Sequence, residues 1–460
     1  MTNPQIFQED IDPNDIKQGY LPDCWFLSAL SSLAERPALV KRLVLTKKYN
    51  KEGIYKIKLC KNGEWVTVTI DDYIPCYYNG GPIFSRGNGD ELWVMLLEKA
   101  YAKMHGCYYS LRYGFTHHGM IDLTGCPTYN INFPVEKPSF EEIENEANKI
   151  WDKILQSDEL GYLISGETPG YDSATEGGGP GNASGLVPGH AYSIIQAKEG
   201  LGVKLLNIRN PWGRYEWDGD YSDNSDKWTD EMIDEFKPVF DVNDGSFWMC
   251  LEDFIMRFSS VNICQVSNWE EIRLKGKFIR AKEKREDGDD WVISKFYYTF
   301  TIDDDDTEVH IGIHQEDSRV LGADRRSYLD ISFVLFKLDP ENKLEVFKVS
   351  DFAVEREVQE SLLLNEGKYI LCPVTSGALL QKPHSAKNEK IEYRIKQDNI
   401  TMPHPFYLST LNDIYRKIDL SLNEILSADE LNQFGRIIKE KKFTDIKQND
   451  FTTDKFKSIS

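Results

Sequence analysis

The chain has 460 residues, more than one hydrophobic core usually holds, so we expect about two to four domains. Its 54 basic against 75 acidic side chains give a net charge of −21, which argues against nucleic acid or an anionic membrane as the main partner. The sequence lacks a secretory signal and any apolar run long enough for a transmembrane segment, and its eight cysteines are scattered, which favours reduced thiols in a cytoplasmic protein.

Two helices are predicted in the first quarter of the chain. Apolar residues recur at helical spacing after Cys24, Asp23 is placed to cap that helix, and Pro37 ends the pattern. A second, strongly amphipathic helix is expected over 92–104.

Two hairpins are predicted as well. The strand-like runs 54–59 and 65–70 flank Asn62-Gly63, and Asn-Gly between such runs is the strongest short hairpin signal. Two later strands flank a turn at Gly200-Leu-Gly202. Before them, the stretch 166–189 is rich in Gly, Ser, Thr and Pro and predicts a loop.

Further along, a connector over 127–138 precedes a helix over about 140–155. From residue 269 the pattern changes to alternating strands separated by acidic runs, which suggests a β-sandwich, and the last sixty or so residues return to helical periodicity. The predicted strands of this region are Phe296–Ile302, Val309–His314, Ile331–Leu338 and Lys368–Cys372.

Cys24 is the cysteine best placed for chemistry, because it lies at a predicted helix start. A helix N-terminus carries partial positive charge, which favours the thiolate, the species that attacks a carbonyl carbon. The alternative is a small buried cysteine with no chemical role. Gln18, earlier in the same segment, offers an amide that could bind an oxyanion together with the Cys24 N–H; the alternative is an exposed loop residue.

His190 and Asn210 lie at equal distances from Gly200 along the sequence. In a symmetric antiparallel hairpin they would face each other at its open end. An Asn amide oxygen can accept from one imidazole nitrogen and turn the other towards a cysteine sulfur. Either residue alone is interpreted as an ordinary core or turn residue, and only their pairing favours catalysis.

Five blocks in this order resemble the protease core of the calpain family. The resemblance covers about residues 8–262, and residues 269–396 are more loosely similar to the calpain β-sandwich, acidic loop included. The blocks are Gln18-Gly with Asp23-Cys-Trp25, Leu97-Glu-Lys-Ala-Tyr-Ala102, Gly189-His-Ala-Tyr-Ser193, Arg209-Asn-Pro-Trp-Gly213 and Gly245-Ser-Phe-Trp-Met249.

The resemblance implies a two-lobed papain-like core with Cys24, His190 and Asn210 as the catalytic triad. Gln18 would be the oxyanion donor, and Trp212 would shield the triad between the lobes. The sequence departs from the family at Pro22, where calpains usually have Gly. Proline removes an N–H and restricts φ in the loop that shapes the oxyanion hole.

The resemblance also implies a calcium site in the second lobe. Glu216, Asp223 and Asp244 match carboxylate ligands of the family, and Val242 stands at a further ligand position. The last Glu of the family is Ser246 here, so three carboxylates would hold the ion more loosely. Solvated surface acids are the alternative in so negative a chain.

The matching site in the first lobe is eroded. Asp15 fits a family carboxylate, but the family's Glu is His118, and imidazole is a poor calcium ligand. His117 and His118 also lack a third metal ligand at suitable spacing, so we interpret them as part of a polar loop.

Residues 419–430 match the twelve-residue EF-hand calcium loop, with helical periodicity on both sides. Glu424 replaces the Gly expected at the sharp turn, so a structural loop with weak calcium affinity is the alternative. EF-hands pair, which implies a partner subunit or self-pairing. The candidate ligands are Asp419, Ser421, Asn423, the carbonyl of Ile425, Ser427 and Glu430.

We therefore predict an α+β fold: a papain-like core, an antiparallel β-sandwich and a short EF-hand-like helical segment. The predicted function is calcium-dependent limited proteolysis of protein substrates through an acyl-thioester. A non-proteolytic adaptor that binds partners and calcium is the alternative; a transglutaminase would want Asp where Asn210 stands. The domain boundaries are 1–125 (lobe with Cys24), 126–262 (lobe with His190 and Asn210), 265–397 (β-sandwich) and 398–460 (EF-hand-like module).

Overall fold

The computed structural model describes residues 3–8, 10–78, 80–134, 139–170, 185–240, 244–284, 290–319, 328–340, 343–375 and 457–458. The chain divides into two compact units. The first holds residues 1–269 and 319–321, and the second holds residues 270–318 and 322–460. None of the helices in the described ranges is long and apolar enough to cross a membrane.

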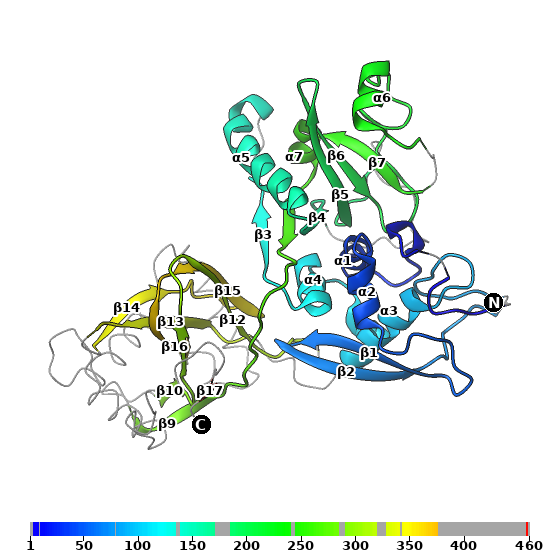
Figure 1. Ribbon diagram of the computed structural model, residues 1–460. Coiled ribbons are helices and arrows are strands. Elements are labelled where there is room, and N and C mark those ends of the chain that lie inside the picture. The colour runs from blue at the N-terminus through cyan, green and yellow to red at the C-terminus, as the bar shows by residue number, and fades with distance from the viewer. Residues whose placement is uncertain are drawn as a thin grey trace. The chain divides into compact units, whose positions relative to one another are not determined.

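In the first half of unit 1, helix α1 lies on the side that borders the second half (Figure 1). The predicted helix at Cys24 is present, but Pro37 does not end it, because α1 stops at Ala34 and Pro37 opens the next helix. Proline is tolerated there because the first turn of a helix needs no N–H donor. The elements are η1 (Pro13–Asp15), α1 (Cys24–Ala34), α2 (Pro37–Leu43), β1 (Ile54–Lys61), β2 (Glu64–Asp71), α3 (Trp93–Met104), η2 (Tyr108–Leu111) and α4 (Thr116–Thr124).

The hairpin of β1 and β2 follows the sequence closely. Asn62 and Gly63 both have positive φ, 51° and 77°, the conformation that a two-residue hairpin turn with the right twist requires. The antiparallel register runs from Lys61 opposite Glu64 to Ile54 opposite Asp71. The predicted hairpin is therefore confirmed.

Helix α1 is buried along its whole length, although it carries three serines, Ser28, Ser31 and Ser32. Its apolar residues join the core with β1 and α3. The hydroxyl of Ser31 accepts from Ser193 at 3.1 Å, and Ser32 donates to the carbonyl of Ile164 at 2.9 Å. These bonds satisfy the hydroxyls of Ser31 and Ser32 where α1 meets the sheet of the second lobe, so this part of α1 faces an interface and not solvent.

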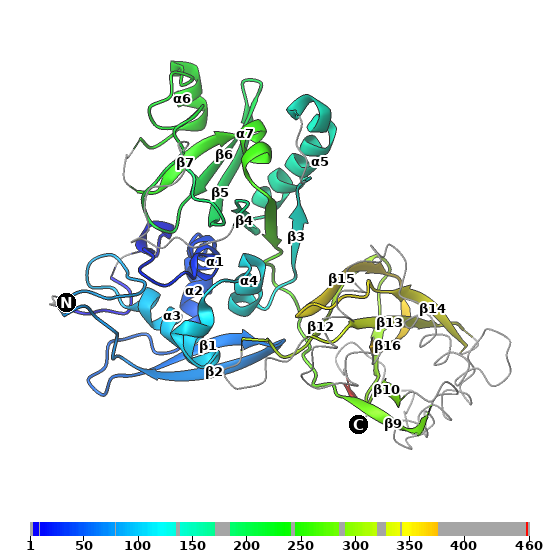
Figure 2. The ribbon, with the colours of Figure 1, turned by 180° about the vertical axis from the view of Figure 1, so that it is seen from behind.

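The second half of unit 1 is built on an antiparallel six-stranded sheet in the order β3-β8-β4-β5-β6-β7. Helices α5 and α7 pack on one face around Trp151 and Phe254, and α6 packs with Leu205 and Trp248 in a smaller cluster (Figure 2). The elements are β3 (Thr128–Asn132), α5 (Phe140–Glu159), β4 (Leu163–Glu167), β5 (Ala191–Gly200), β6 (Val203–Arg209), α6 (Asp230–Phe236), β7 (Ser246–Cys250), α7 (Leu251–Arg257) and β8 (Ser260–Cys264).

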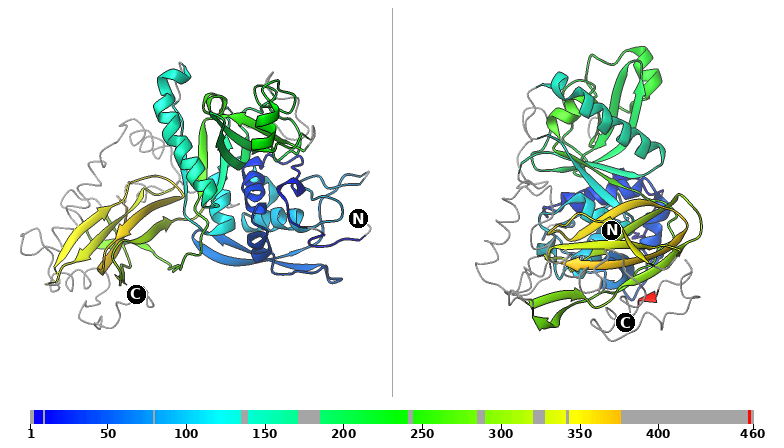
Figure 3. Two further views of the ribbon diagram at one scale, coloured as in Figure 1. Left: turned by 45° about the horizontal axis from the view of Figure 1, so that its top comes forward. Right: turned by 90° about the vertical axis from the view of Figure 1, so that its left-hand side faces the viewer.

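Unit 2 consists of antiparallel strands in its described residues (Figure 3). One sheet has the order β14-β13-β16-β11-β17, and β12 pairs with β15 along its whole length. Phe300, Phe333 and Tyr369 form the centre of its core. The strands are β9 (Phe278–Lys284), β10 (Asp290–Ser294), β11 (Tyr298–Ile302), β12 (Thr307–His314), β13 (Ile331–Leu338), β14 (Leu344–Val349), β15 (Glu357–Leu364), β16 (Gly367–Thr375) and β17 (Lys457–Ser458).

The mixed α and β composition with antiparallel sheets is as predicted. The EF-hand-like loop 419–430 lies outside the described residues.

Candidate active site

Cys24 is the first residue of α1 and is buried, with 3% of its surface exposed. The first-turn N–H groups of the helix surround it with positive potential, as the sequence suggested. Asp23 holds the N-cap position, but its side chain makes no capping hydrogen bond, so the predicted cap is wrong. The Asp23 carboxyl is instead directed towards Glu98 on α3.

His190 and Asn210 meet at the open end of the β5–β6 hairpin. His190 Nε2 lies 2.9 Å from Asn210 Oδ1. The strands are not in the symmetric register assumed from the sequence, because a β-bulge between Ile194 and Gln196 shifts the pairing. Asn210 is held from both sides: its oxygen accepts from the Trp212 N–H at 3.0 Å, and its amide donates to the carbonyl of Tyr215 at 3.0 Å.

Aromatic rings enclose the imidazole of His190. The ring of Trp212 lies 4.9 Å from it, centroid to centroid, and that of Tyr192 lies 5.0 Å away in an edge-to-face arrangement. Trp212 is 2% exposed. A dry, aromatic surrounding strengthens every electrostatic interaction made at the site.

Burial lowers the pKa of His190 to about 4, and the hydrogen bond from Asn210 opposes this effect only in part. Its Nδ1 is buried and has no hydrogen-bond partner. Burial raises the pKa of Tyr192, and ionisation of the nearby Cys24 thiol would raise it further. Cys24 is therefore electrostatically coupled to the strand that follows His190.

Gln18 is completely buried, so the alternative of an exposed loop residue is wrong. Its backbone N–H donates to the carbonyl of Pro211 at 3.0 Å, and its side-chain amide donates to the carbonyl of Leu21 at 2.7 Å. Pro22 lies in the same bend, where its carbonyl accepts from the Tyr113 N–H at 2.9 Å. The segment before Cys24 is thus anchored to the residue that follows Asn210.

Arg209 is a structural contributor that the sequence reasoning did not single out. Its guanidinium is 1% exposed and donates to Asn14 Oδ1, the carbonyl of Ile16 and Ser31 Oγ at 2.8, 3.0 and 3.3 Å. Burial lowers its pKa to about 10, so it stays charged at neutral pH, helped by Asp244 and two other acids. Its position directly before Asn210 in the sequence is the feature that could have pointed to this structural role.

Two of the predicted second-lobe calcium ligands come together. Glu216 Oε1 accepts from the N–H of Gly245 at 2.9 Å, and Asp244 is the preceding residue. Asp244 Oδ1 also accepts from the N–H of Ser246 at 2.6 Å. Carboxylate oxygens on a tight turn fit a calcium ion. Asp223 lies with Glu216 in the connection between β6 and α6, whereas Val242 and the EF-hand ligands fall outside the described residues.

The first-lobe positions are less suited to calcium. Asp15 is engaged within its own turn, accepting from the Asp12 N–H at 3.0 Å and from Asn88 Nδ2 at 3.1 Å. Burial raises the pKa of Asp15, which disfavours the charged form. His118 is buried in α4 and brings a nitrogen where calcium prefers oxygen. Asp15 and His118 therefore fit the ion poorly.

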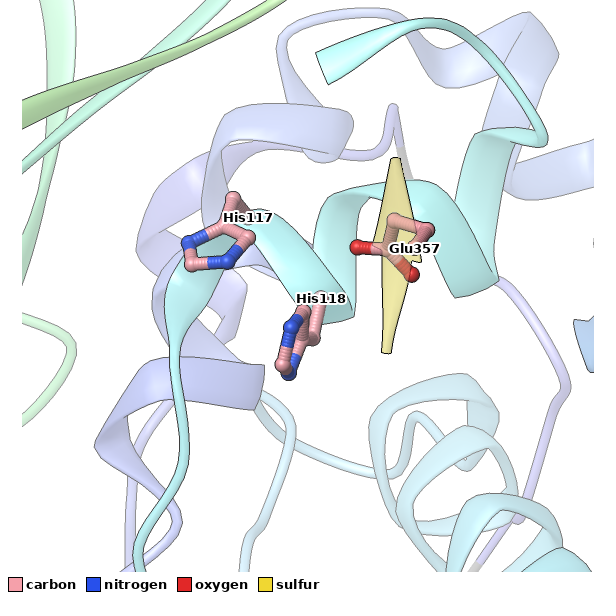
Figure 4. A group of neighbouring side chains, drawn as sticks. All are labelled: His117, His118 and Glu357. Carbon is pink, nitrogen blue, oxygen red and sulfur yellow. The ribbon is translucent and has the colours of Figure 1, made fainter. Parts of the chain in front are cut away.

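His117 and His118 do not lie in a polar loop, because both belong to the first turns of α4. Figure 4 shows the two side chains on this helix, and their ring centroids lie 4.4 Å apart. The third labelled residue, Glu357, belongs to β15 of the second unit.

A thiol at a helix start in one lobe and a hydrogen-bonded His–Asn pair in the other are typical of papain-like cysteine proteases. The family described as "Calpain family cysteine protease" matches residues 1–265. The chain therefore belongs to the calpain family of cysteine proteases.

Several characterised relatives are similar to this chain. It is 39% identical over 267 residues to the calpain-type cysteine protease DEK1 of Arabidopsis thaliana, covering 58% of this chain and 12% of that protein. It is 29% identical over 422 residues to Calpain-5 of Mus musculus, covering 81% and 65%. It is 33% identical over 282 residues to the Calpain-1 catalytic subunit of Rattus norvegicus, covering 58% and 37%. The chain thus spans only part of the length of these relatives.

Proposed function

We propose that this chain is a calcium-dependent cysteine endopeptidase that cleaves protein substrates at a limited number of sites. The observation that carries the proposal is the 2.9 Å contact between His190 Nε2 and Asn210 Oδ1, because it leaves Nδ1 as the nitrogen available to a thiol. Membership of the calpain family supports the same reaction class.

In this mechanism Cys24 is the nucleophile and His190 is the general base. The Cys24 thiol gives its proton to His190 Nδ1, and the sulfur attacks the carbonyl carbon of the scissile peptide bond. The imidazolium then protonates the leaving amine, the C–N bond breaks, and an acyl-thioester remains. His190 next takes a proton from water, whose oxygen displaces the sulfur and releases the new carboxylate.

Gln18 and the backbone N–H of Cys24 are the donors proposed for the oxyanion of the tetrahedral intermediate. The amide of Gln18 is fixed through Leu21, and its backbone is fixed through Pro211. Asn210 keeps the imidazole in the orientation that points Nδ1 towards the sulfur. Trp212 packs beside the ring and excludes water from the His–Asn hydrogen bond.

Calcium is proposed as the activating ion, held in the second lobe by Glu216, Asp223 and Asp244 and by Val242. When bound, the cation would neutralise these carboxylates and rigidify the turn at Gly245, whose carbonyl accepts from the N–H of Asn210 at 2.8 Å. That contact links the proposed calcium turn directly to the triad. Asp15 is proposed to contribute little, because its carboxylate already accepts hydrogen bonds from the Asp12 N–H and from Asn88.

We further propose a cytoplasmic location, because all eight cysteines are present as thiols and not as disulfides. The EF-hand-like segment, with Asp419 and Glu430 at its ends, is proposed to pair with a partner subunit or a second copy of itself.

The test is casein hydrolysis by the purified chain at saturating free calcium and in excess chelator. Cys24→Ala should abolish hydrolysis and labelling by a peptide epoxide, whereas Cys76→Ala, which removes an exposed thiol, should leave both unchanged. Hydrolysis retained by Cys24→Ala would overturn the assignment. A wild-type chain that neither cleaves casein nor reacts with the epoxide would favour the adaptor alternative. Full activity in excess chelator would contradict the proposed calcium dependence but not the assignment as a protease.

A further inference from the structure

Glu98 is a buried carboxyl close to the proposed site that the mechanism above does not use. It lies on α3 and is 2% exposed. Both of its carboxyl oxygens lie within hydrogen-bond distance of one donor, the backbone N–H of Ser85, at 3.1 and 3.2 Å. A buried acid is costly unless it is hydrogen-bonded, so its position needs a reason.

The segment that Glu98 holds runs directly beside the segment that carries Gln18. Lys17 and Arg86 exchange backbone hydrogen bonds at 3.1 and 2.9 Å, and the Tyr20 N–H donates to the carbonyl of Ile83 at 3.0 Å. Ser85 lies between Ile83 and Arg86 in the sequence, and therefore between these two contacts.

The segment that carries Gln18 and the segment that carries Ser85 come into tight contact at Gly19. A Cβ added there would lie 2.2 Å from the carbonyl oxygen of Phe84, which no side chain tolerates. The backbone around Gln18 therefore follows any movement of the Ser85 segment, because no space between the two segments can absorb the movement.

Glu98 also faces the other side of the site. The side chain of Asp23, the residue directly before Cys24, lies close enough to Glu98 to lower the pKa of Glu98 against the effect of burial. Two carboxyl groups can share a hydrogen bond only when one of them carries a proton. Burial raises the pKa of Glu98 to about 7, which matches a shared proton at neutral pH. Tyr108 of η2 is a further ionisable group nearby, and its pKa is raised first by burial and then by Glu98 and Asp23.

We propose that Glu98 is a positioning residue for the acyl-transfer reaction: it fixes the distance between the Gln18 segment, through Ser85, and the start of α1, through Asp23. This inference rests on the proposed function, because it presumes that Gln18 and Cys24 act on one carbonyl group. Glu98 itself touches no reacting atom. Its removal leaves the thiol and the imidazole in place but lets the two oxyanion donors drift apart.

The experiment compares three variants in peptide hydrolysis, with kcat expressed per active site counted by peptide-epoxide titration. Glu98→Ala should lower kcat by about tenfold or more with KM little changed, since the oxyanion is bound only in the transition state. Glu98→Gln should restore kcat to within about threefold, because its amide oxygen can accept from Ser85 and its NH2 can donate to Asp23.

The matched control is Glu91→Ala. Glu91 is a second buried glutamate of the same lobe, 3% exposed, which accepts from the Gln8 N–H at 2.7 Å and from Trp93 Nε1 at 3.2 Å. Its loss should lower stability as much as the loss of Glu98 but leave kcat per titrated site within about twofold. An equal loss of kcat in both variants would overturn the inference, and so would wild-type kcat in Glu98→Ala.

A second readout keeps the inference testable if Glu98→Ala does not fold. Above pH 7 the Glu98–Asp23 pair loses the proton that the two carboxyl groups share, so the wild-type kcat should decline there, whereas Glu98→Gln cannot ionise and should hold its kcat to higher pH. Identical alkaline profiles of the wild type and Glu98→Gln would overturn the inference. A wild-type chain without any hydrolysis would instead overturn the proposed function.

Discussion

The backbone N–H of Gln18 donates a hydrogen bond to the carbonyl of Pro211 at 3.0 Å. This single contact joins the segment that leads into Cys24 to the residue that follows Asn210. The positions of Gln18, the proposed oxyanion donor, and of Asn210, the proposed orienting amide, are therefore linked through one backbone hydrogen bond. Each of the two lobes therefore positions residues that belong to the proposed chemistry of the other.

Gln18→Ala should lower kcat by about 100-fold, because one of two donors to the oxyanion is lost. The rate of Cys24 alkylation by iodoacetamide should change little, since that displacement passes through no oxyanion. Gln8→Ala is the control, because Gln8 Oε1 accepts from the Asp90 N–H at 3.2 Å, away from the site. Equal losses in hydrolysis and alkylation would show that Gln18 acts by supporting the fold.

Asn210→Ala should lower kcat by about 100-fold, because the imidazole of His190 loses the oxygen that orients it. Unlike Gln18→Ala, this change should also slow alkylation of Cys24, since a misplaced imidazole no longer stabilises the thiolate. Asn207→Ala on β6 is the matched control and should retain both rates. Undiminished alkylation in Asn210→Ala would argue against the orienting role.

Acid should destabilise the protein through His190. Its pKa is lowered to about 4 in the folded chain, so between pH 6.5 and 4 the unfolded chain binds a proton that the folded chain does not. The free energy of unfolding should fall by about 3 kcal/mol across that window. Urea unfolding of Cys24→Ala and of Cys24→Ala with His190→Gln isolates the effect from the thiolate. Parallel pH curves for the two proteins would contradict it.

Arg209→Met should lower the free energy of unfolding by about 3 kcal/mol, because Asn14, Ile16 and Ser31 lose a buried donor. Arg257→Met is the control. Arg257 is half exposed, its guanidinium lies 3.9 Å from the Asp253 carboxylate, and its loss should cost less than about 1 kcal/mol. Urea unfolding at pH 7 measures both, and equal losses would contradict the bridging role of Arg209.

Glu216→Gln should raise the free calcium needed for half-maximal activity by about tenfold. The substitution keeps an oxygen for the Gly245 N–H but removes one negative charge from the proposed site. Maximal activity at saturating calcium should be retained. Glu231→Gln, on the first turn of α6, removes an exposed charge and is the control. An unchanged calcium midpoint in Glu216→Gln would exclude Glu216 as a ligand.

Much of the local structure was predictable from short stretches of sequence. The Asn62-Gly63 turn, the helix at Cys24 and the hairpin near Gly200 depend on residues that are neighbours in the chain. The proximity of His190 and Asn210 followed from the same local reasoning. The bulge after Ile194 was not predictable, because nothing in the residue types marks where an extra residue enters a strand.

The side chain of Asp23 adopts a contact that its local sequence does not predict. Its position at a helix start predicted a capping role, yet its carboxyl turns to Glu98, 75 positions along the chain. A capping bond and a buried carboxyl pair compete for the same side chain, and packing of α3 against α1 decides between them. Ser31 and Ser32 of α1 are a similar case, since only the second lobe explains why they are buried.

The amino-acid sequence by itself determined many of the local elements, the order of the family's blocks and the residue types that chemistry needs. Tertiary structure alone decided which of those residues touch: Gln18 with Pro211, Glu98 with Ser85, Arg209 with three partners in the other lobe. The physical reason is the distance along the chain over which each interaction acts. Backbone preference and side-chain periodicity act over a few residues, whereas contacts between distant segments exist only after both lobes have packed.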